Sequence, residues 1–100
     1  MLINNVESVD SYGGKIHRAD DQEILETLLT NTFPTVFMTR FLGQGLKSRV
    51  AHKSAIINMG SYLAETRLMS APVYSAASSF ENVFSETIGY ENPDVDVLTV

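Results

Sequence analysis

Residues 54–59 (SAIINM) constrain the fold of this chain more than any other stretch. The run is short, apolar and rich in β-branched residues, which is typical of a strand buried on both faces of a parallel sheet. Gly60 and Ser61 follow at the carboxyl end of that strand, the edge where open α/β sheets bind their ligands. We therefore expect a parallel sheet with a ligand site directly after Met59.

Two more strands are predicted on either side of this run. Residues 1–6 have the pattern of the end of a strand, residues 7–19 that of a polar loop, and residues 95–100 that of a last strand. Strands that alternate with helices imply right-handed crossovers in a parallel sheet. The predicted fold class is therefore α/β, a partial Rossmann-like sheet of about three strands and two main helices in one partial domain over residues 1–100.

The first helix is predicted over residues 20–43. Asp20 and Glu23 match an acidic capping box at its start, and Gly43-Gln44-Gly45 is typical of a helix end. Its apolar stripe comprises Ile24, Leu25, Leu28, Leu29, Phe33, Val36, Phe37 and Phe41.

Pro34 lies inside this helix and cannot donate to the carbonyl of Thr30, so we expect a kink next to Asn31. The Asn31 side chain can satisfy the backbone groups freed there, or it can reach a ligand. Both interpretations stay open at this point.

The second helix is predicted over residues 74–91, after a loop that ends in Pro72. Ala77, Phe80, Phe84 and Ile88 recur every three or four residues, which indicates an amphipathic helix.

Composition excludes several classes of function. The formal net charge of −5 argues against a binder of nucleic acid or of anionic membranes. The chain has no cysteine, so it holds neither a disulfide framework nor a thiolate metal site, which fits an intracellular location with no organelle indicated. His17 and His52 have no ligand neighbours at suitable spacing, so no metal site is expected. No apolar run is long enough to cross a membrane.

Three strands with only two helices leave part of a parallel sheet uncovered. We therefore expect this chain to expose apolar surface and to depend on other protein chains of a larger complex. The helices at 20–43 and 74–91 are the expected docking elements.

Several spaced motifs resemble the central and C-terminal part of the short-chain dehydrogenase/reductase family. The nearest branch comprises the 17β-hydroxysteroid dehydrogenases and 3-oxoacyl-CoA reductases. Residues 2–6 (LINNV) are similar to the segment that closes the fourth strand of that family, with Glu7 in place of a glycine. Residues 31–40 resemble the helix that carries the active-site asparagine, and residues 56–61 resemble the NxSS motif. Residues 74–78 resemble YxxxK.

The resemblance implies catalytic roles for Asn31, Ser61 and Tyr74, and a cofactor-binding role for Asn4 and Asn5. The lysine of YxxxK would lower the pKa of the tyrosine and bind the nicotinamide ribose. In this chain Ser78 occupies that position, and a hydroxyl performs neither task well.

The TGxxxGxG loop that cradles the cofactor pyrophosphate in the family is not in this sequence. We therefore expect a degenerate, non-catalytic structural subunit without a cofactor. The alternative is an NAD(P)-dependent oxidoreductase, of the hydroxysteroid or 3-oxoacyl-CoA reductase type, whose other half is supplied elsewhere. A third possibility is a binding module that keeps a pocket for an acyl chain.

Overall fold

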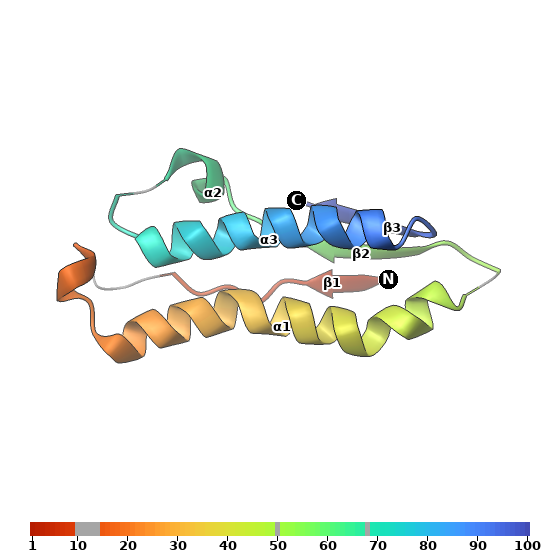
Figure 1. The fold of residues 1–100 in the computed structure, drawn as a ribbon, viewed down its shortest axis with the longest axis horizontal. Coiled ribbons are helices and arrows are strands. Elements are labelled where there is room, and N and C mark those ends of the chain that lie inside the picture. Colours follow the sequence, from red (N-terminus) through yellow and green to blue (C-terminus); the bar gives the residue numbers. More distant parts are fainter. Residues whose placement is uncertain (10–14, 50, 68) are drawn as a thin grey trace.

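The computed structural model describes residues 1–9, 15–49, 51–67 and 69–100. The described elements, in chain order, are β1 (Leu2–Asn4), the 3₁₀ turn η1 (Ile16–Arg18), α1 (Asp21–Lys47), β2 (Ser54–Asn58), α2 (Leu63–Thr66), α3 (Pro72–Glu91) and β3 (Val95–Thr99) (Figure 1). The predicted alternation of three strands and two main helices is confirmed. The short elements η1 and α2 lie in segments that were expected to be loops.

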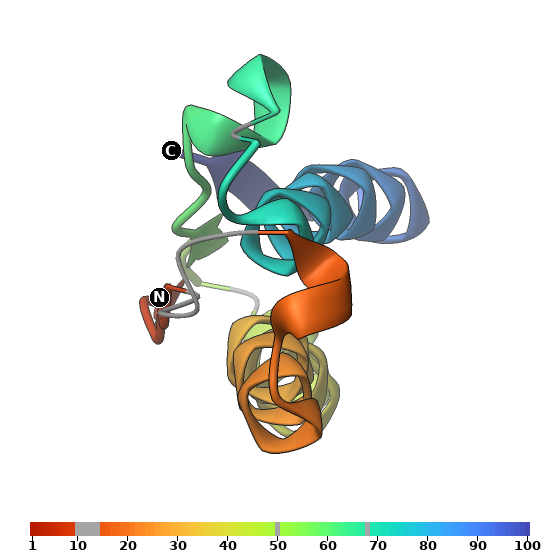
Figure 2. The same cartoon turned by 90° about the vertical axis from the view of Figure 1, so that its left-hand side faces the viewer.

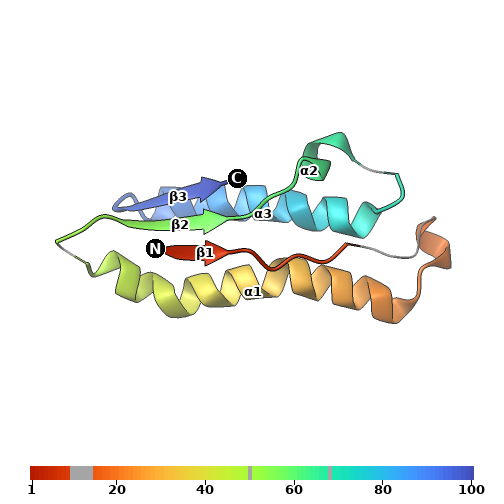
Figure 3. The same ribbon diagram turned by 180° about the vertical axis from the view of Figure 1, so that it is seen from behind.

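The three strands form one parallel sheet in the order β1-β2-β3, with Ile56 paired to Leu2 on one side and to Val97 on the other. Both long helices lie on the same side of this sheet (Figure 2). Seen from behind, the strands lie in front of the helices, and no helix crosses them (Figure 3). Ile3 and Leu98 are more than half exposed on this bare face, so the predicted partial cover of the sheet is confirmed.

The prediction that β2 is buried on both faces is wrong. Ser54, Ile56 and Asn58 are buried under the helices, but Ala55 and Ile57 on the other face are only half-buried. The difference follows from the missing cover on that face, because only a sheet with helices on both sides buries all residues of a central strand.

Helix α1 starts where the sequence predicts and ends later. Asp20 is the N-cap, and its Oδ1 accepts a hydrogen bond from the Gln22 backbone amide at 3.0 Å. The predicted end at Gly43-Gln44-Gly45 is wrong, because the helix continues to Lys47. Leu46 packs against the hydrophobic core, and this burial offsets the low helix propensity of two interior glycines.

The face that α1 turns toward the rest of the chain is polar. Its buried residues are Thr27, Asn31, Thr32, Thr35 and Thr39. Six of the eight residues of the predicted apolar stripe are exposed, with Phe33 and Phe41 at 52% and 66%, whereas Ile24 and Val36 are half-buried. An ordinary surface helix has the opposite arrangement.

Helix α3 starts at Pro72, two residues before the predicted start at Tyr74, and proline is favoured at this first helical position. Its buried residues are Tyr74, Ser75, Ala77, Ser78, Glu81 and Ser85. Of the predicted apolar positions, only Ala77 is fully buried, and Phe80 is exposed. Small and polar side chains therefore line the contact between α3 and its neighbours.

The chain is extended for its length. Its principal extents are 52 × 24 × 17 Å and its radius of gyration is 15.0 Å, whereas a compact domain of this size has a radius of gyration of about 13 Å. Within the described ranges, no helix has the length and apolar character needed to span a membrane.

The buried core is small and is extended by a chain of side-chain hydrogen bonds. Leu2, Ile56 and Val95 form the hydrophobic cluster. Next to it, Asn4 Nδ2 donates to Asn58 Oδ1 at 2.7 Å, and Asn58 Nδ2 donates to Ser85 Oγ at 2.6 Å. Asn58, which is 1% exposed, thereby joins β1, β2 and α3.

We expect Asn58→Ala to lower the free energy of unfolding by about 2–4 kcal/mol, because it removes two hydrogen bonds and leaves two buried partners unsatisfied. Thermal and urea unfolding of the purified protein measure this change. Asn5→Ala is the matched control, since Asn5 is exposed and its replacement should change stability by less than about 0.5 kcal/mol. Equal effects of the two substitutions would contradict the role given to Asn58.

Candidate functional site

The candidate site lies at the carboxyl edge of the sheet, where the segments after β1 and β2 meet the start of α3. Tyr74 is 3% exposed, and its phenol hydroxyl donates a hydrogen bond to Oε1 of Glu7. Glu7 stands where the resembling motif has a glycine, so a carboxylate now occupies the space beside the phenol.

Burial raises the pKa of the Tyr74 phenol above its ordinary value of 10.0, and the hydrogen bond and negative charge of Glu7 raise it further. The hydroxyls of Ser61 and Ser78 lie beside the phenol and act in the opposite direction, lowering that pKa. The structure thus brings Ser61, Tyr74 and Ser78 together. The net effect keeps Tyr74 protonated at neutral pH.

No lysine or arginine among the described residues contributes to the pKa of Tyr74. Arg67, which lies between Ser61 and Tyr74 in the sequence, is not among the groups that shift this pKa, and neither are Lys15 and Lys53.

Ser61 is half-buried, and its Oγ accepts a hydrogen bond from the Leu63 backbone amide at 3.2 Å. The preceding Gly60 donates its amide to the Val100 carbonyl at 2.8 Å. A Cβ at Gly60 would lie 2.7 Å from Cγ2 of Thr99, which is too close. The glycine therefore lets the chain leave β2 tightly against β3 and sets the position of Ser61.

Asn31 holds the segment after β1 to helix α1. Its Nδ2 donates to the carbonyls of Ser8 and Thr27, both at 2.6 Å, and its Oδ1 accepts from the Ser8 amide at 2.9 Å. The carbonyl of Thr30, which Pro34 leaves free, is not among these partners. The side chain therefore fixes Ser8, and with it the neighbouring Glu7 that reaches Tyr74.

The two asparagines with a predicted cofactor role differ in their surroundings. Asn4 is buried, and its amide donates to Asn58, whereas Asn5 is exposed. In this structure the Asn4 side chain therefore joins β1 to β2.

The residues present do not fit a nicotinamide cofactor. The Asn4 amide is already bonded, Ser78 brings no positive charge, and Glu7 adds a negative charge next to the phenol. Across the described ranges, no group of three histidine, aspartate or glutamate side chains could hold a metal ion.

Two acidic residues in this region were not identified from the sequence. Glu7 was noted only as a departure from a glycine. Glu81 is buried between the long helices, where its Oε1 accepts from Thr35 Oγ at 2.6 Å and its Oε2 has no hydrogen-bond partner. Its spacing of seven residues from Tyr74, which places both on one helical face, is the signal that could have identified it.

The fold and these motifs define an α/β domain with a tyrosine and a serine at the carboxyl edge of a parallel sheet. The family model described as short chain dehydrogenase matches residues 1–99. The chain therefore belongs to the short-chain dehydrogenase family. Comparison with curated protein sequences gives no significant match.

Solved structures support the fold. An alcohol dehydrogenase from Comamonas testosteroni, specific for bulky-bulky ketones, is 23% identical with a TM-score of 0.86, over 99% of this chain and 39% of its own. A short-chain dehydrogenase/reductase from Burkholderia vietnamiensis is 16% identical with a TM-score of 0.85, over 99% of this chain and 45% of its own.

A third similar structure is the putative carbonyl reductase Sniffer of Caenorhabditis elegans. It is 28% identical with a TM-score of 0.80, over 98% of this chain and 48% of its own. The chain thus spans less than half the length of each of these three proteins.

We expect Glu7→Gln to lower the pKa of the Tyr74 phenol, because the neighbouring negative charge is removed while burial remains. At a given alkaline pH, a larger fraction of the Tyr74 phenol should therefore be ionised in the variant than in the wild type. The wild type and Glu7→Gln are each titrated by ultraviolet absorbance, with and without the additional substitution Tyr74→Phe. The difference within each pair gives the titration of Tyr74 alone. Glu65→Gln, at an exposed position, is the control, and an unchanged Tyr74 titration in Glu7→Gln would contradict the contact.

Glu81→Gln should stabilise the protein at neutral pH. Burial raises the folded-state pKa of Glu81 above its ordinary value of 4.5, and the Thr35 hydrogen bond only partly opposes this shift. Stability from the neutral carboxyl is fully present below that ordinary value and is lost as pH rises through the raised pKa. Glutamine remains neutral, so we expect a gain of about 1 kcal/mol, or roughly 4–8 °C in Tm, at pH 7.

The gain from Glu81→Gln should shrink as the pH falls toward 4, where the wild-type carboxyl is protonated as well. Glu86→Gln, at an exposed position of the same helix, should show no comparable pH-dependent gain. Thermal unfolding of the wild type and both variants at pH 7 and pH 4 measures these gains. A gain for Glu81→Gln that is the same at both pH values would contradict this explanation.

Proposed function

We propose that this chain is a non-catalytic member of its family that acts as a structural subunit of a larger protein assembly. The observation that carries the proposal is the outward apolar stripe of α1, where aromatic rings face solvent and threonines face the interior. Such a surface is unfavourable in a monomer and typical of a protein interface.

The stripe continues toward α3 through an apolar groove of about 400 Å³. This groove is lined by Leu28, Thr32, Phe33, Val36, Phe37 and Phe80. Phe33 and Phe37 pack edge to face with their ring centroids 5.8 Å apart, so they form a fixed aromatic surface. Aromatic anchors of this kind supply most of the binding energy in many interfaces. The groove thus favours docking through both long helices.

The surroundings of Tyr74 support the non-catalytic part of the proposal. Its hydroxyl donates to Glu7, and Ser78 supplies no positive charge. Loss of a positioned acid–base partner typically costs on the order of 10²–10⁴ in rate. The Glu7 contact and the absence of a lysine at position 78 act in the same direction, since both disfavour the phenolate form of Tyr74.

A second candidate is an NAD(P)-dependent oxidoreductase of which this chain supplies the substrate side, in the hydroxysteroid or 3-oxoacyl-CoA reductase branch. Ser61 and Tyr74 favour it, because their hydroxyls lie together at the carboxyl edge. One similar structure, an NADH-dependent reductase that is 24% identical, was solved with NAD. In that case Asn31 would hold the segment at Ser8 in place through its hydrogen bonds to the Ser8 backbone.

Purification of the chain from its source under mild conditions, with intact-mass measurement, distinguishes the two candidates. A chain of 11.0 kDa in a stable assembly without bound nicotinamide would support the structural subunit. A heavier chain, or a stoichiometric partner that carries a glycine-rich loop and NAD(P), would favour the oxidoreductase. Tyr74→Phe would then test activity directly.

The double substitution Phe33→Ser and Phe37→Ser should weaken association with the assembly by about 2–4 kcal/mol, because it removes two aromatic anchors. Both side chains are exposed, so the fold should remain, as circular dichroism can verify. Tyr62→Ser is the matched control at an aromatic residue away from the stripe that is also exposed. Light scattering coupled to gel filtration measures the assembly, and unchanged association of the double variant would reject this interface.

A further inference from the structure

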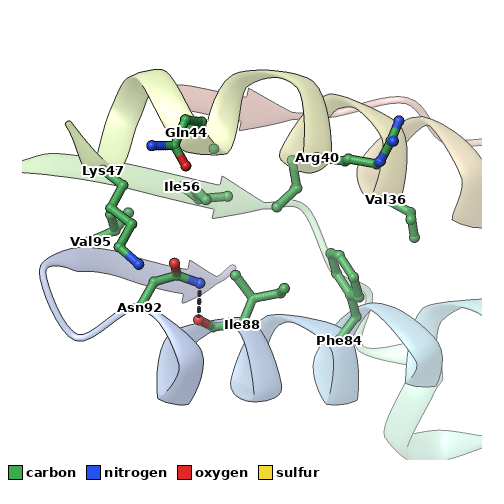
Figure 4. A pocket seen from close by; sticks show the side chains of 11 residues that line it. Val36, Arg40, Gln44, Lys47, Ile56, Phe84, Ile88, Asn92 and Val95 are labelled. Atoms are coloured by element: carbon green, nitrogen blue, oxygen red, sulfur yellow. Dashed lines mark hydrogen bonds between the residues drawn. The ribbon is translucent and has the colours of Figure 1, made fainter. Parts of the chain in front are cut away.

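A second pocket lies at the opposite end of the sheet from Tyr74. It has a volume of about 330 Å³, and it opens between α1, α3 and the early residues of β2 and β3 (Figure 4). We call it the amino-edge pocket. Its lining includes the apolar side chains of Ile56, Phe84, Ile88 and Val95 and the cationic side chains of Arg40 and Lys47. Its volume falls within the range of small-molecule sites.

The interior of the amino-edge pocket is apolar. Ile56 and Val95 belong to the hydrophobic core, and Ile88 packs against them. Thr39 also lines the pocket, but its Oγ is shielded from solvent. The interior therefore suits an alkyl chain.

The mouth of the pocket carries positive charge. Figure 4 shows the Lys47 side chain extending toward Asn92 at the end of α3. Asn92 donates its amide to the Ile88 carbonyl at 3.0 Å, which leaves its own side-chain oxygen outside that bond.

The depression next to this mouth shares Lys47 and also contains Arg49, Lys53, Asp94 and Asp96. Three cations face two carboxylates there, and His52 is a further basic group in the same depression. The local charge is therefore positive although the whole chain carries −5, which favours an anionic head group at Lys47.

Lys47 thus lies at the mouth of a pocket whose interior is apolar. We propose that the amino-edge pocket binds a medium-chain carboxylate. The carboxylate pairs with Lys47, and the alkyl chain lies against Ile56, Phe84 and Ile88. This binding is independent of the chemistry at Tyr74.

Two glycines of α1 offer a matched test. Gly43 lines the pocket and Gly45 does not, and a Cβ at either position would meet nothing within 4 Å. Leucine favours a helix at both positions, but only Gly43→Leu places a side chain into the pocket. The probe is decanoate, and its binding is measured by titration calorimetry on the purified protein together with any partner it carries.

We expect the wild type and Gly45→Leu to bind the probe, and Gly43→Leu to lose binding. Lys47→Gln should weaken binding about tenfold or more, as expected for a lost charge-assisted hydrogen bond. Failure of the wild type to bind, equal behaviour of the two glycine variants, or an unaffected Lys47→Gln would each overturn the proposal.

Discussion

The side-chain amide of Asn58 holds the structure together at the point where strand and helix packing meet. It accepts from Asn4 of β1 and donates to Ser85 of α3, so one buried residue fixes three elements. Because β1 is only three residues long, its backbone ladder alone gives it little support. The position of the following segment, with Glu7 and Ser8, therefore depends on Asn58 through Asn4.

The two long helices depend on this same polar interior. The buried residues of α1 are threonines and Asn31, those of α3 are mostly small or polar, and the Thr35–Glu81 hydrogen bond joins the two helices. Each of these polar groups requires a partner, and Glu81 Oε2, Thr39 Oγ, Ser54 Oγ and Ser75 Oγ have none. The apolar side chains that would stabilise an isolated pair of helices lie outside instead. In the proposed assembly, a partner surface that covers the stripe would add hydrophobic stabilisation that the chain does not obtain from its own interior.

The sequence predicted the elements well because each has a local cause. A β-branched run formed β2, and Asp20 capped α1. The end of α1 could not be predicted from Gly43 and Gly45, because the packing of the distant core against Leu46 decides it. The sequence could not predict which way the apolar stripe faces either. Periodicity shows that a helix has an apolar face but not which neighbour covers it.

The candidate site also depends on a contact between residues far apart in the sequence, which local patterns do not predict. Ser61, Tyr74 and Ser78 were identified from the family motifs that they resemble, and the structure places them together. The partner of Tyr74 is Glu7, which is 67 residues away in sequence, and no local pattern pairs them. The resembling motif requires a positive charge beside the phenol, and this chain has a negative one. Restoring a lysine at Ser78 alone would therefore place a cation opposite a carboxylate that already accepts a hydrogen bond from the phenol. The lysine would then pair with Glu7 as well as with Tyr74, so the effect of one position on the phenol depends on the other.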